Sequence, residues 1–371
     1  MGRNTTVINK LGFGFLRLPK IGEEYDWDTL CKMTDLYLEQ GGDFFDTCYT
    51  YLNGNSEYGI KKCLTERYPR HRYRLSDKLP GYRCTCYEDA QHFFDESLAR
   101  CGVEYFDVFL LHMLNGKNYD IAEKYDQFRF LREKKAEGKV KRIGFSYHDN
   151  ADLLDQILTA HPEVDVVLLQ INYLDWDTAG IESGKCYETC MRHGKSVLVM
   201  EPVKGGNLAN IPEDAAKHLR AMHPDWSPAD WALRFVQSLE GVEVCLSGMS
   251  SIEQVEDNMR PFMPLMQAEI DHLMQVRPVI ANKTAVACTD CRYCVAHCPR
   301  HIAIPDVFKM YNEICRYPGD DWKIGASYLQ LTKAGGKASD CIGCRSCERQ
   351  CPQHLPIAET MKLAAEKLEE K

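Results

Sequence analysis

The sequence predicts an α/β protein in two parts, a (β/α)8 TIM barrel followed by a small, mainly helical domain. Apolar strand-like runs alternate with helical patterns eight times over roughly the first 260 residues. Two cysteine runs of identical spacing lie near the end of the chain. The length of 371 residues exceeds what one compact domain usually needs. We therefore place the barrel at residues 1–282 and the second domain at residues 283–371.

The eight predicted strands are short runs dominated by apolar residues. They are Leu11–Leu18, Asp43–Thr47, Tyr73–Leu79, Phe106–Met113, Val140–Tyr147, Val164–Tyr173, Ser196–Val203 and Val242–Ser247. Apolar strands that are each followed by a helix are typical of a parallel sheet covered on both faces. Eight repeats favour a closed barrel, and an open doubly wound sheet is the alternative.

Helices with one apolar face are predicted between the strands. In Trp27–Gln40, the spacing of Leu30, Met33 and Tyr37 places apolar side chains on adjoining faces of a helix. The other predicted helices are Glu57–Glu66, Tyr87–Cys101 and the segments 120–137, 150–160, 181–193, 227–240 and 251–259. In such a barrel the chemistry takes place at the carboxyl ends of the strands, so polar residues there are candidates for a site.

Polar residues stand at the ends of three successive predicted strands. Asp46 ends the second strand, with Tyr51 in the loop beyond it, while Lys78 ends the third and His112 the fourth. A nearby ammonium lowers the pKa of a tyrosine, so Lys78 would make Tyr51 a better acid. Asp46 would fix Lys78, and His112 would orient a hydrogen bond at a substrate oxygen. Each residue alone has an ordinary structural explanation, but together they predict a catalytic group.

The motifs around these residues resemble the aldo-keto reductase family over residues 1 to about 260. The matching motifs are Asp46-Thr47, Tyr51, Asn55-Ser56-Glu57, Lys78, Leu110-Leu111-His112, Gly144-Phe145-Ser146, Gln170, Asn172-Tyr173, Glu201-Pro202, Gly205-Gly206 and the run from Ser247-Gly248 to Asp257-Asn258. The resemblance implies an oxidoreductase in which Tyr51 is the general acid. Lys78 and Asp46 would tune it, and His112 would position a carbonyl for hydride from NAD(P)H.

The resemblance also implies which residues bind the nicotinamide cofactor. Ser146 and Gln170 would hold its carboxamide, and Asp257 and Asn258 would hold its adenine end. Tyr147 departs from the family, which commonly has Asn at this position, so one nicotinamide contact is missing or replaced.

A second departure concerns the choice between NADH and NADPH. Gly248 and Gln254 stand where NADPH-using members tend to carry cationic side chains for the 2′-phosphate, and Glu253 adds a negative charge nearby. Without such a clamp we expect no strong preference for NADPH. The loop that covers the substrate in the family is replaced by the segment leading into the second domain.

Two runs of four cysteines, each closed by a proline, organise the second domain. Both have the spacing C-x2-C-x2-C-x3-C-P, which is the bacterial ferredoxin pattern. Zinc is the alternative, but a four-coordinate zinc ribbon has no role for the proline or the fourth cysteine. In two-cluster ferredoxins the fourth cysteine of each run binds the other cluster. The expected ligands are Cys288, Cys291, Cys294 and Cys351 for one 4Fe-4S cluster, and Cys341, Cys344, Cys347 and Cys298 for the other.

Composition indicates an ordinary globular protein of a reducing compartment. Hydrophobic residues make up 44% and charged residues 27%, and no apolar run approaches the roughly 18 residues of a membrane span. Ten of the 18 cysteines lie outside the two runs, without paired spacing, and we expect them to be reduced and the protein to be cytoplasmic. The net charge is −9, and no basic stripe suggests nucleic acid.

The cysteine-rich domain is the basic part of the chain, with 13 Lys and Arg against 11 Asp and Glu in residues 283–371. Arg292, Arg300, Arg345 and Arg349 lie between or beside the cysteines, where they would offset the negative charge of the clusters. A helix is expected at Pro305–Arg316, and the segments after the two runs form an internal pseudo-repeat.

From Lys283 onward the chain resembles the helical two-cluster ferredoxin modules associated with flavin and quinone oxidoreductases. This resemblance implies electron transfer, with a ferredoxin or flavoprotein as a partner. Nicotinamide gives two electrons together as hydride, whereas each cluster passes one electron at a time. Three options follow: a flavin in the barrel mouth joins the two, the substrate accepts electrons singly, or no exchange occurs.

Three functions remain open from the sequence. The first is reduction of a carbonyl or related small molecule, with electrons passed by the two clusters, directly or through a flavin. The second is an ordinary NAD(P)-dependent reductase whose clusters are structural. The third is a non-catalytic electron-transfer or regulatory subunit, and the intact group of Asp46, Tyr51, Lys78 and His112 weighs against it.

Overall fold

The computed structural model describes residues 10–178, 181–316, 321–333 and 335–369, and its chain divides into two compact units. The barrel unit comprises Met1–Pro202 and Ala229–Met266. The cluster unit comprises Val203–Pro228 and Gln267–Lys371. A segment that follows a barrel strand, Val203–Pro228, therefore belongs with the carboxyl-terminal part of the chain.

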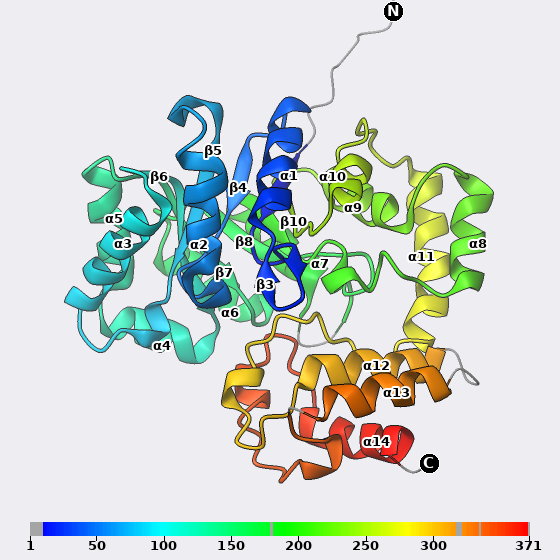
Figure 1. Cartoon of the computed structure of the whole chain (residues 1–371). Helices are drawn as coiled ribbons and strands as arrows, with labels where there is room; N and C mark the ends of the chain where they lie inside the picture. Colours follow the sequence, from blue (N-terminus) through cyan, green and yellow to red (C-terminus); the bar gives the residue numbers. More distant parts are fainter. Residues whose placement is uncertain (1–9, 179–180, 317–320, 334, 370–371) are drawn as a thin grey trace, which may run out of the picture. The chain divides into compact units, whose positions relative to one another are not determined.

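Eight parallel strands of the described chain close into a barrel (Figure 1). They are β1 (Leu11–Gly14), β4 (Phe44–Asp46), β5 (Arg74–Leu79), β6 (Phe106–Leu114), β7 (Val140–Tyr147), β8 (Val166–Gln170), β9 (Ser196–Met200) and β10 (Val242–Ser247). Each strand pairs with the next one of this series, and β10 pairs with β1. The predicted (β/α)8 barrel is confirmed, and the open-sheet alternative is wrong.

The helices of the barrel unit follow the predicted order with local differences. They are α1 (Trp27–Glu39), α2 (Asn55–Ile60), α3 (Glu88–Cys101), α4 (Gly116–Lys124), α5 (Gln127–Ala136), α6 (Ala151–Ala160), α7 (Ser183–Arg192), α9 (Pro228–Ser238) and α10 (Ile252–Asn258). The helix predicted at 120–137 is two helices, because Asp126 between them has a left-handed φ of 51°. The hairpin of β2 (Lys20–Ile21) and β3 (Glu24–Tyr25) was not predicted.

One pair of cysteines outside the two runs is bonded. Cys31 in α1 and Cys63 in the π-helical turn Lys61–Thr65 form a disulfide. The expectation that all ten of these cysteines are reduced is therefore wrong for this pair. The two residues are 32 positions apart and meet only because α1 packs beside the end of α2, so their spacing gave no signal.

Strand alternation determines which side chains enter the barrel. A buried apolar cluster is formed by alternate residues of five strands: Phe44, Val108, Leu110, Val166, Leu168, Leu198, Val244 and Leu246. Side chains two positions apart lie on the same face of a strand. Asp46, His112 and Gln170 each follow a member of this cluster by two positions, so they continue the inward rows at the carboxyl ends of β4, β6 and β8.

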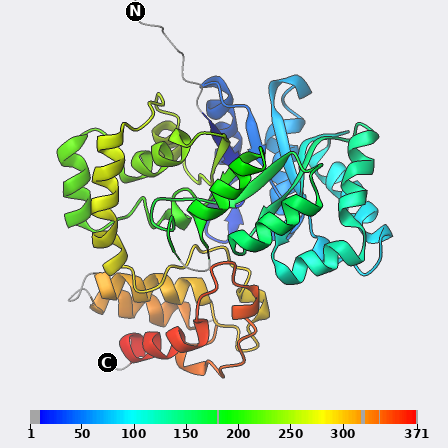
Figure 2. The same cartoon turned by 180° about the vertical axis from the view of Figure 1, so that it is seen from behind.

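The cluster unit is helical outside the cysteine runs. Its helices are α8 (Glu213–Met222), α11 (Gln267–Asn282), α12 (Ile304–Arg316), α13 (Asp321–Leu331) and α14 (Ile357–Glu369). Figures 1 and 2 both show α8 beside α11, and Lys283 Nζ lies 2.7 Å from Asp214 Oδ2. Only the helix at α12 was predicted. None of the described helices is both long and apolar enough to cross a membrane.

Candidate functional site

Lys78 lies at the carboxyl end of β5, with its side chain fully buried. Its Nζ lies 2.8 and 2.7 Å from the two carboxylate oxygens of Asp46 and 2.7 Å from the carbonyl oxygen of Thr47. An ammonium has three hydrogens to donate, and these acceptors surround it. Burial raises the pKa of Asp46, and the Lys78 charge opposes this rise. Asp46 thus holds the ammonium in one place, which is the role expected for it.

Tyr51 begins a short turn, Tyr51–Gly54, after β4. Leu52 in this turn has a φ of 53°, an uncommon conformation for a leucine that stores backbone strain. The two ends of the loop are joined by a 2.6 Å hydrogen bond between the hydroxyls of Thr47 and Ser56. The loop therefore presents Tyr51 in a defined position rather than as a loose surface residue.

The Tyr51 ring lies close to two other members of the predicted group. The Lys78 Nζ is 4.7 Å from the centre of the ring, and the ring centres of Tyr51 and His112 are 5.8 Å apart. Burial, and then the positive charge of Lys78, lower the pKa of His112 well below its usual value. The structure thus brings together all four residues predicted as catalytic, with His112 as a neutral imidazole.

Ser146 and Gln170, the residues expected to hold the nicotinamide carboxamide, lie at the ends of the adjoining strands β7 and β8. The Ser146 hydroxyl accepts a hydrogen bond from the Met113 N–H at 2.8 Å. The Gln170 Nε2 donates to Asp175 at 2.9 Å. A hydroxyl and a side-chain amide are both able to hydrogen-bond a carboxamide. The structure places these two residues on neighbouring strands, and their binding of a carboxamide stays a prediction.

The residues expected at the adenine end lie on α10. Asn258 Nδ2 donates to the Ser247 hydroxyl at 3.0 Å, and Asp257 lies 3.3 Å from Arg260. Asn258 thus ties α10 to the end of β10. Tyr147, which departs from the family, donates its hydroxyl to the carbonyl oxygen of Asn150 at 2.5 Å.

A cation from a distant part of the chain, Arg17, lies against Gly248. A Cβ built on Gly248 would be 3.2 Å from the Cγ and Cδ atoms of Arg17, so the arginine stem packs on this backbone. Its Nη2 lies 3.3 Å from Glu201 Oε1. The Gln254 side chain accepts the Ser250 N–H at 2.8 Å instead. Arg17 comes from the loop after β1, so counting back from Asn258 could not find it.

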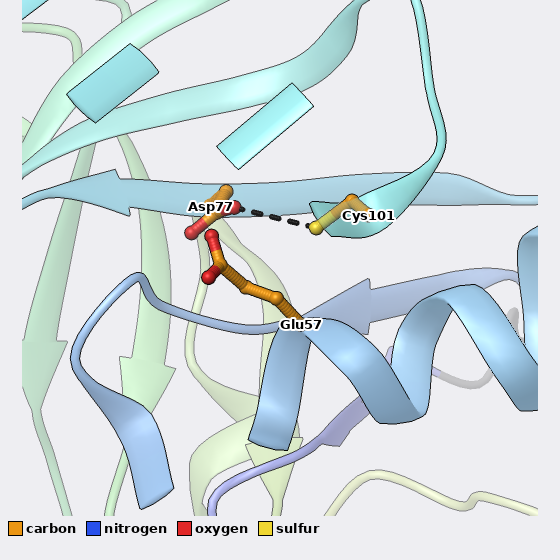
Figure 3. A group of neighbouring side chains, drawn as sticks. All are labelled: Glu57, Asp77 and Cys101. Atoms are coloured by element: carbon orange, nitrogen blue, oxygen red, sulfur yellow. Dashed lines mark hydrogen bonds between the residues drawn. The ribbon is translucent and has the colours of Figure 1, made fainter. Parts of the chain in front are cut away.

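A second polar group lies on the outer face of β5, one residue before Lys78. Asp77 accepts the N–H of Lys78 at 2.7 Å and the thiol of Cys101 at 3.6 Å. Figure 3 shows Glu57 of α2 directed at the same place, and one ligand atom from each of the three residues lies within 4.8 Å of the others. All three side chains are buried, and their positions along the chain follow no pattern that would group them.

The charges of this outer group are best balanced by one shared proton. Glu57 Oε2 lies 3.2 Å from Arg100, whereas its Oε1 has no hydrogen-bond partner among the described residues. Burial, and then the negative charge of Glu57, raise the pKa of Asp77 well above its usual value. A protonated Asp77 can donate to that oxygen. Glu57, Asp77 and Cys101 are also metal-ligand types, but Arg100 already balances Glu57.

The eight cysteines of the two runs line two separate cavities. The first cysteine cavity includes Cys288, Cys291, Cys294 and Cys351 in its wall. The second cysteine cavity includes Cys298, Cys341, Cys344 and Cys347. In each cavity one cysteine comes from the other run, which is the grouping that the ferredoxin cross-ligation rule predicts.

The two runs share one backbone conformation at positions 53 residues apart. The pairs of residues with positive φ are Asp290 and Gly343, Arg292 and Arg345, and His301 and His354. The helices α12 and α14 also begin 53 residues apart. Left-handed residues within a turn direct backbone N–H groups toward a common point, and such nests bind anions, including iron-sulfur clusters. The backbone therefore fits two clusters, as the cysteines do.

Three of the four arginines expected to offset cluster charge lie within 4 Å of carboxylates, whereas Arg349 donates to the Ser346 hydroxyl. Arg292 lies 2.7 Å from Asp306 and 3.0 Å from Asp290. Arg300 and Arg345 lie 3.8 and 3.7 Å from carboxylates. Their positive charge is therefore shared between nearby acids and any bound cluster.

The segment after β9 contacts the first cysteine run within the cluster unit. Asn207 Nδ2 donates to the carbonyl oxygen of Cys288 at 2.8 Å. Gly205 has a φ of 65°, and a Cβ on it would lie 2.3 Å from the carbonyl oxygen of Thr289. Only glycine allows this close approach. Gly205-Gly206 belongs to the motifs that resemble the family, and its distance from the cysteines along the chain gives no sign of this contact.

Two family models match the chain. The model of the Aldo/keto reductase family matches residues 10–278, and that of a 4Fe-4S dicluster domain matches residues 287–356. Among curated proteins, the acetyl-CoA decarbonylase/synthase complex subunit alpha 1 of Methanosarcina barkeri is 34% identical over 80 residues, which are 22% of this chain and 8% of that protein. This chain thus matches less than a tenth of that relative's length.

Solved structures of similar fold include two aldo-keto reductases. The holo form of the enzyme from Bacillus halodurans has a TM-score of 0.59 and 24% identity, covering 72% of this chain and 91% of that one. An enzyme from Klebsiella pneumoniae in complex with NADPH has a TM-score of 0.57 and 20% identity, with the same coverage. At these identities the likeness shows the fold alone.

Proposed function

The chain belongs to the aldo/keto reductase family, and we propose that its barrel unit reduces a carbonyl group of a small molecule with Tyr51 as the proton donor. The observation that carries this proposal is the buried Lys78 ammonium, held by Asp46 and 4.7 Å from the centre of the Tyr51 ring. A fixed cation at this distance stabilises the phenolate that remains after Tyr51 gives up its proton.

His112 contributes a hydrogen bond rather than a proton. Its pKa lies well below the usual value because the ring is buried near Lys78, so the imidazole is neutral at physiological pH. Its ring centre is 5.8 Å from that of Tyr51, which allows both side chains to reach one substrate oxygen. Tyr51 then protonates the oxygen that His112 orients, and negative charge does not accumulate on it.

NAD(P)H is the cofactor we propose for the barrel unit, where it supplies hydride. Ser146 and Gln170 would hold the carboxamide, and Asp257 and Asn258 would hold the adenine end. Gly248 would lie beside the ribose phosphate. The NADPH complex of the Klebsiella pneumoniae enzyme supports this cofactor class.

We also propose that the two cysteine cavities hold 4Fe-4S clusters that take part in electron transfer. Each cluster exchanges one electron at a time. Reduction of a carbonyl to an alcohol takes two electrons and two protons. In this route the two bound clusters would supply both electrons in place of hydride, while Tyr51 supplies one proton and solvent the other. The course of the chain favours electron transfer between the clusters and the barrel site. Asn207, which donates a hydrogen bond to Cys288, follows the end of the barrel strand β9 by seven residues.

A flavin would connect two-electron transfer from nicotinamide with one-electron transfer by the clusters. Nicotinamide gives two electrons together as hydride, so direct exchange with a one-electron cluster is chemically awkward. The second candidate function avoids this difficulty: NAD(P)H alone drives turnover, and the clusters hold the cluster unit together. The contact of Arg17 with Gly248 favours it, since a cation there suits a nucleotide phosphate.

The second cysteine cavity offers the more accessible route for an external electron donor. Cys344 is exposed, and the neighbouring Ile342 is 64% exposed. The matching Cys291 of the first run is half-buried. A ferredoxin or flavoprotein is the partner class proposed for this exposed edge.

The decisive experiment separates coupled from uncoupled electron transfer. The holoprotein is reduced chemically under anaerobic conditions, without nicotinamide, and mixed rapidly with benzaldehyde, with and without added flavin. We expect cluster absorption to recover in step with alcohol formation. Clusters that stay reduced while NADH or NADPH alone drives full turnover would establish the second candidate. The Tyr51→Phe protein is the control, since its clusters should reduce normally but release no alcohol.

A further inference from the structure

Cys48 contacts His112 inside the barrel unit. It lies two residues after Asp46, is fully buried, and places its Sγ 3.2 Å from Nδ1 of His112 and 4.0 Å from Nε2. The same sulfur lies 3.4 Å from the Thr50 hydroxyl and 3.8 Å from the carbonyl oxygen of Lys78. The sulfur is therefore closest to the Nδ1 atom of the imidazole.

We propose that Cys48 is a positioning residue whose thiol donates a hydrogen bond to Nδ1 of His112 and thereby keeps the imidazole proton on Nε2. A neutral imidazole carries one N–H, and the group bound to one nitrogen determines which nitrogen that is. With Nδ1 accepting from the thiol, Nε2 is the donor. The functional meaning of this tautomer rests on the proposed carbonyl reduction, in which His112 must donate to the substrate oxygen.

The opposite tautomer of His112, with its proton on Nδ1, makes poorer use of the hydrogen-bonding groups around Cys48. If Nδ1 carried the proton, it would donate to sulfur, a weak acceptor, and the thiol would donate to the Thr50 hydroxyl at 3.4 Å or the Lys78 carbonyl at 3.8 Å. In the proposed assignment the thiol donates to a ring nitrogen, a good acceptor, and the Thr50 hydroxyl can donate to sulfur at 3.4 Å. Only the proposed assignment uses the good acceptor Nδ1 and leaves the Nε2 hydrogen for the substrate oxygen, so it is favoured.

The surroundings keep both groups neutral. Burial raises the pKa of the Cys48 thiol to about 12, so it keeps the hydrogen that it donates. Burial and the positive charges of Lys78, His148 and Arg83 lower the pKa of His112. The other ring neighbours of His112 are the tyrosines Tyr51 and Tyr82, whose ring centres lie 5.8 and 6.0 Å away.

The test reads the tautomer directly. Holoprotein labelled with ¹⁵N-histidine is studied by NMR at neutral pH, and His112→Gln identifies the His112 signals among those of the 12 histidines. We expect a protonated Nε2 and an unprotonated Nδ1 in the native chain and in Cys48→Ser, which keeps a donor. Cys48→Ala and Cys48→Val should show both tautomers. Cys245→Ala, which removes another buried thiol of the barrel, should resemble the native chain.

Turnover of benzaldehyde gives a second readout. We expect kcat to fall about three- to tenfold in Cys48→Ala and Cys48→Val, the worth of one hydrogen bond, with KM nearly unchanged and with recovery in Cys48→Ser. Equal loss in the Ser and Ala variants, or an Nδ1 proton in the native chain, overturns the proposal. If Cys48→Ala does not fold, Cys48→Val decides, because its side chain is close to cysteine in size. If the proteins show the predicted tautomers but neither the native chain nor any variant reduces the aldehyde, the positioning role is supported and carbonyl reduction is rejected.

Discussion

The two candidate sites of this molecule are assembled in opposite ways. In the barrel unit, Asp46, Lys78 and His112 meet only because β4, β5 and β6 pair in parallel register. In the cluster unit, a short local pattern occurs twice, 53 residues apart, and each copy lends one cysteine to the other. The barrel site is a single network without a spare copy, whereas the cluster unit has two similar sites joined by an exchange.

This difference determines how far damage should spread. A substitution in the barrel network should affect one chemical step and leave the fold intact, because each residue there has its own task. A substitution of a cysteine should destroy one cluster, and for Cys298 or Cys351 that cluster lies in the cavity of the other run. The exchange of Cys298 and Cys351 is therefore the feature that distinguishes two linked sites from two independent ones.

The largest effect is expected for Cys298→Ala. Iron and acid-labile sulfide should fall from about eight to about four of each per chain after anaerobic preparation, since one cluster loses a ligand. The remaining cluster should have the spectrum left by Cys344→Ala, a variant of the second cavity, and not that left by Cys291→Ala. Electron paramagnetic resonance of the reduced proteins makes this comparison.

The matched control is Cys315→Ala, which removes a half-buried cysteine of α12 outside both runs. Its iron content should equal that of the native chain. A Cys298→Ala spectrum like that of Cys291→Ala would mean that each run keeps its own four ligands. Stoichiometric zinc without visible absorption would show that the cysteines bind zinc and not iron-sulfur clusters.

The next largest effect is expected for Tyr51→Phe. Loss of the donated proton should lower kcat by about 10²–10⁴-fold, the usual range for a general acid, with cofactor affinity nearly unchanged. Steady-state kinetics and cofactor titration check both parts. Tyr82→Phe removes a hydroxyl from another ring next to His112 and should keep most of the activity. Full turnover in Tyr51→Phe would show that a different group supplies the proton.

The cysteine site and the barrel site could be predicted from the sequence to different extents, for physical reasons. The ferredoxin spacing is local, so all eight cysteines and their exchange followed from sequence, and the strands ending at Asp46, Lys78 and His112 followed from apolar runs. Contacts that depend on packing between distant elements gave no such signal. Cys48 reaches His112 over 64 positions, and the Cys31–Cys63 disulfide spans 32. Which ligand the barrel takes is likewise beyond a residue pattern.

The two faces of β5 offer a test within the barrel unit. Lys78 faces inward, toward Asp46 and Tyr51, whereas Asp77 faces outward, toward Glu57. Asp77 keeps a proton because burial and the negative charge of Glu57 raise its pKa well above its usual value. The folded chain then binds one more proton than the unfolded chain above about pH 4, the unfolded pKa of Asp. Stability from this group therefore falls as pH rises from there to the folded pKa.

Asp77→Asn should remove this dependence, because an amide can donate to Glu57 without titrating. The free energy of unfolding of the variant minus that of the native chain should grow with pH, by at most about 1.4 kcal/mol per pH unit. Urea unfolding of the anaerobic holoprotein from pH 5.5 to 8 measures it. Asp120→Asn, at an exposed position of α4, should show no such slope. Parallel curves for native and Asp77→Asn chains would mean that Asp77 is ionised in the fold.

The smallest effect is expected for the choice of nicotinamide cofactor. Gly248 and Gln254 leave the expected phosphate positions without charge, and Arg17 supplies one cation that is already 3.3 Å from Glu201. A partly exposed pair of this kind is worth about 1 kcal/mol or less. We therefore expect NADPH to bind less than about tenfold more tightly than NADH, and Arg17→Gln to bring the two Kd values together.

Titration of the anaerobic holoprotein with each cofactor measures this preference. Arg67→Gln, which breaks an exposed ion pair with Asp35, is the matched control and should leave the ratio of Kd values unchanged. A hundredfold preference for NADPH would require a stronger phosphate contact than one shared arginine can give. A preference that survives in Arg17→Gln would place the ribose phosphate away from Gly248. In that case contacts other than the Arg17 cation would determine whether the barrel binds NADH or NADPH. The bound cofactor would then be the one that exchanges electrons with the clusters.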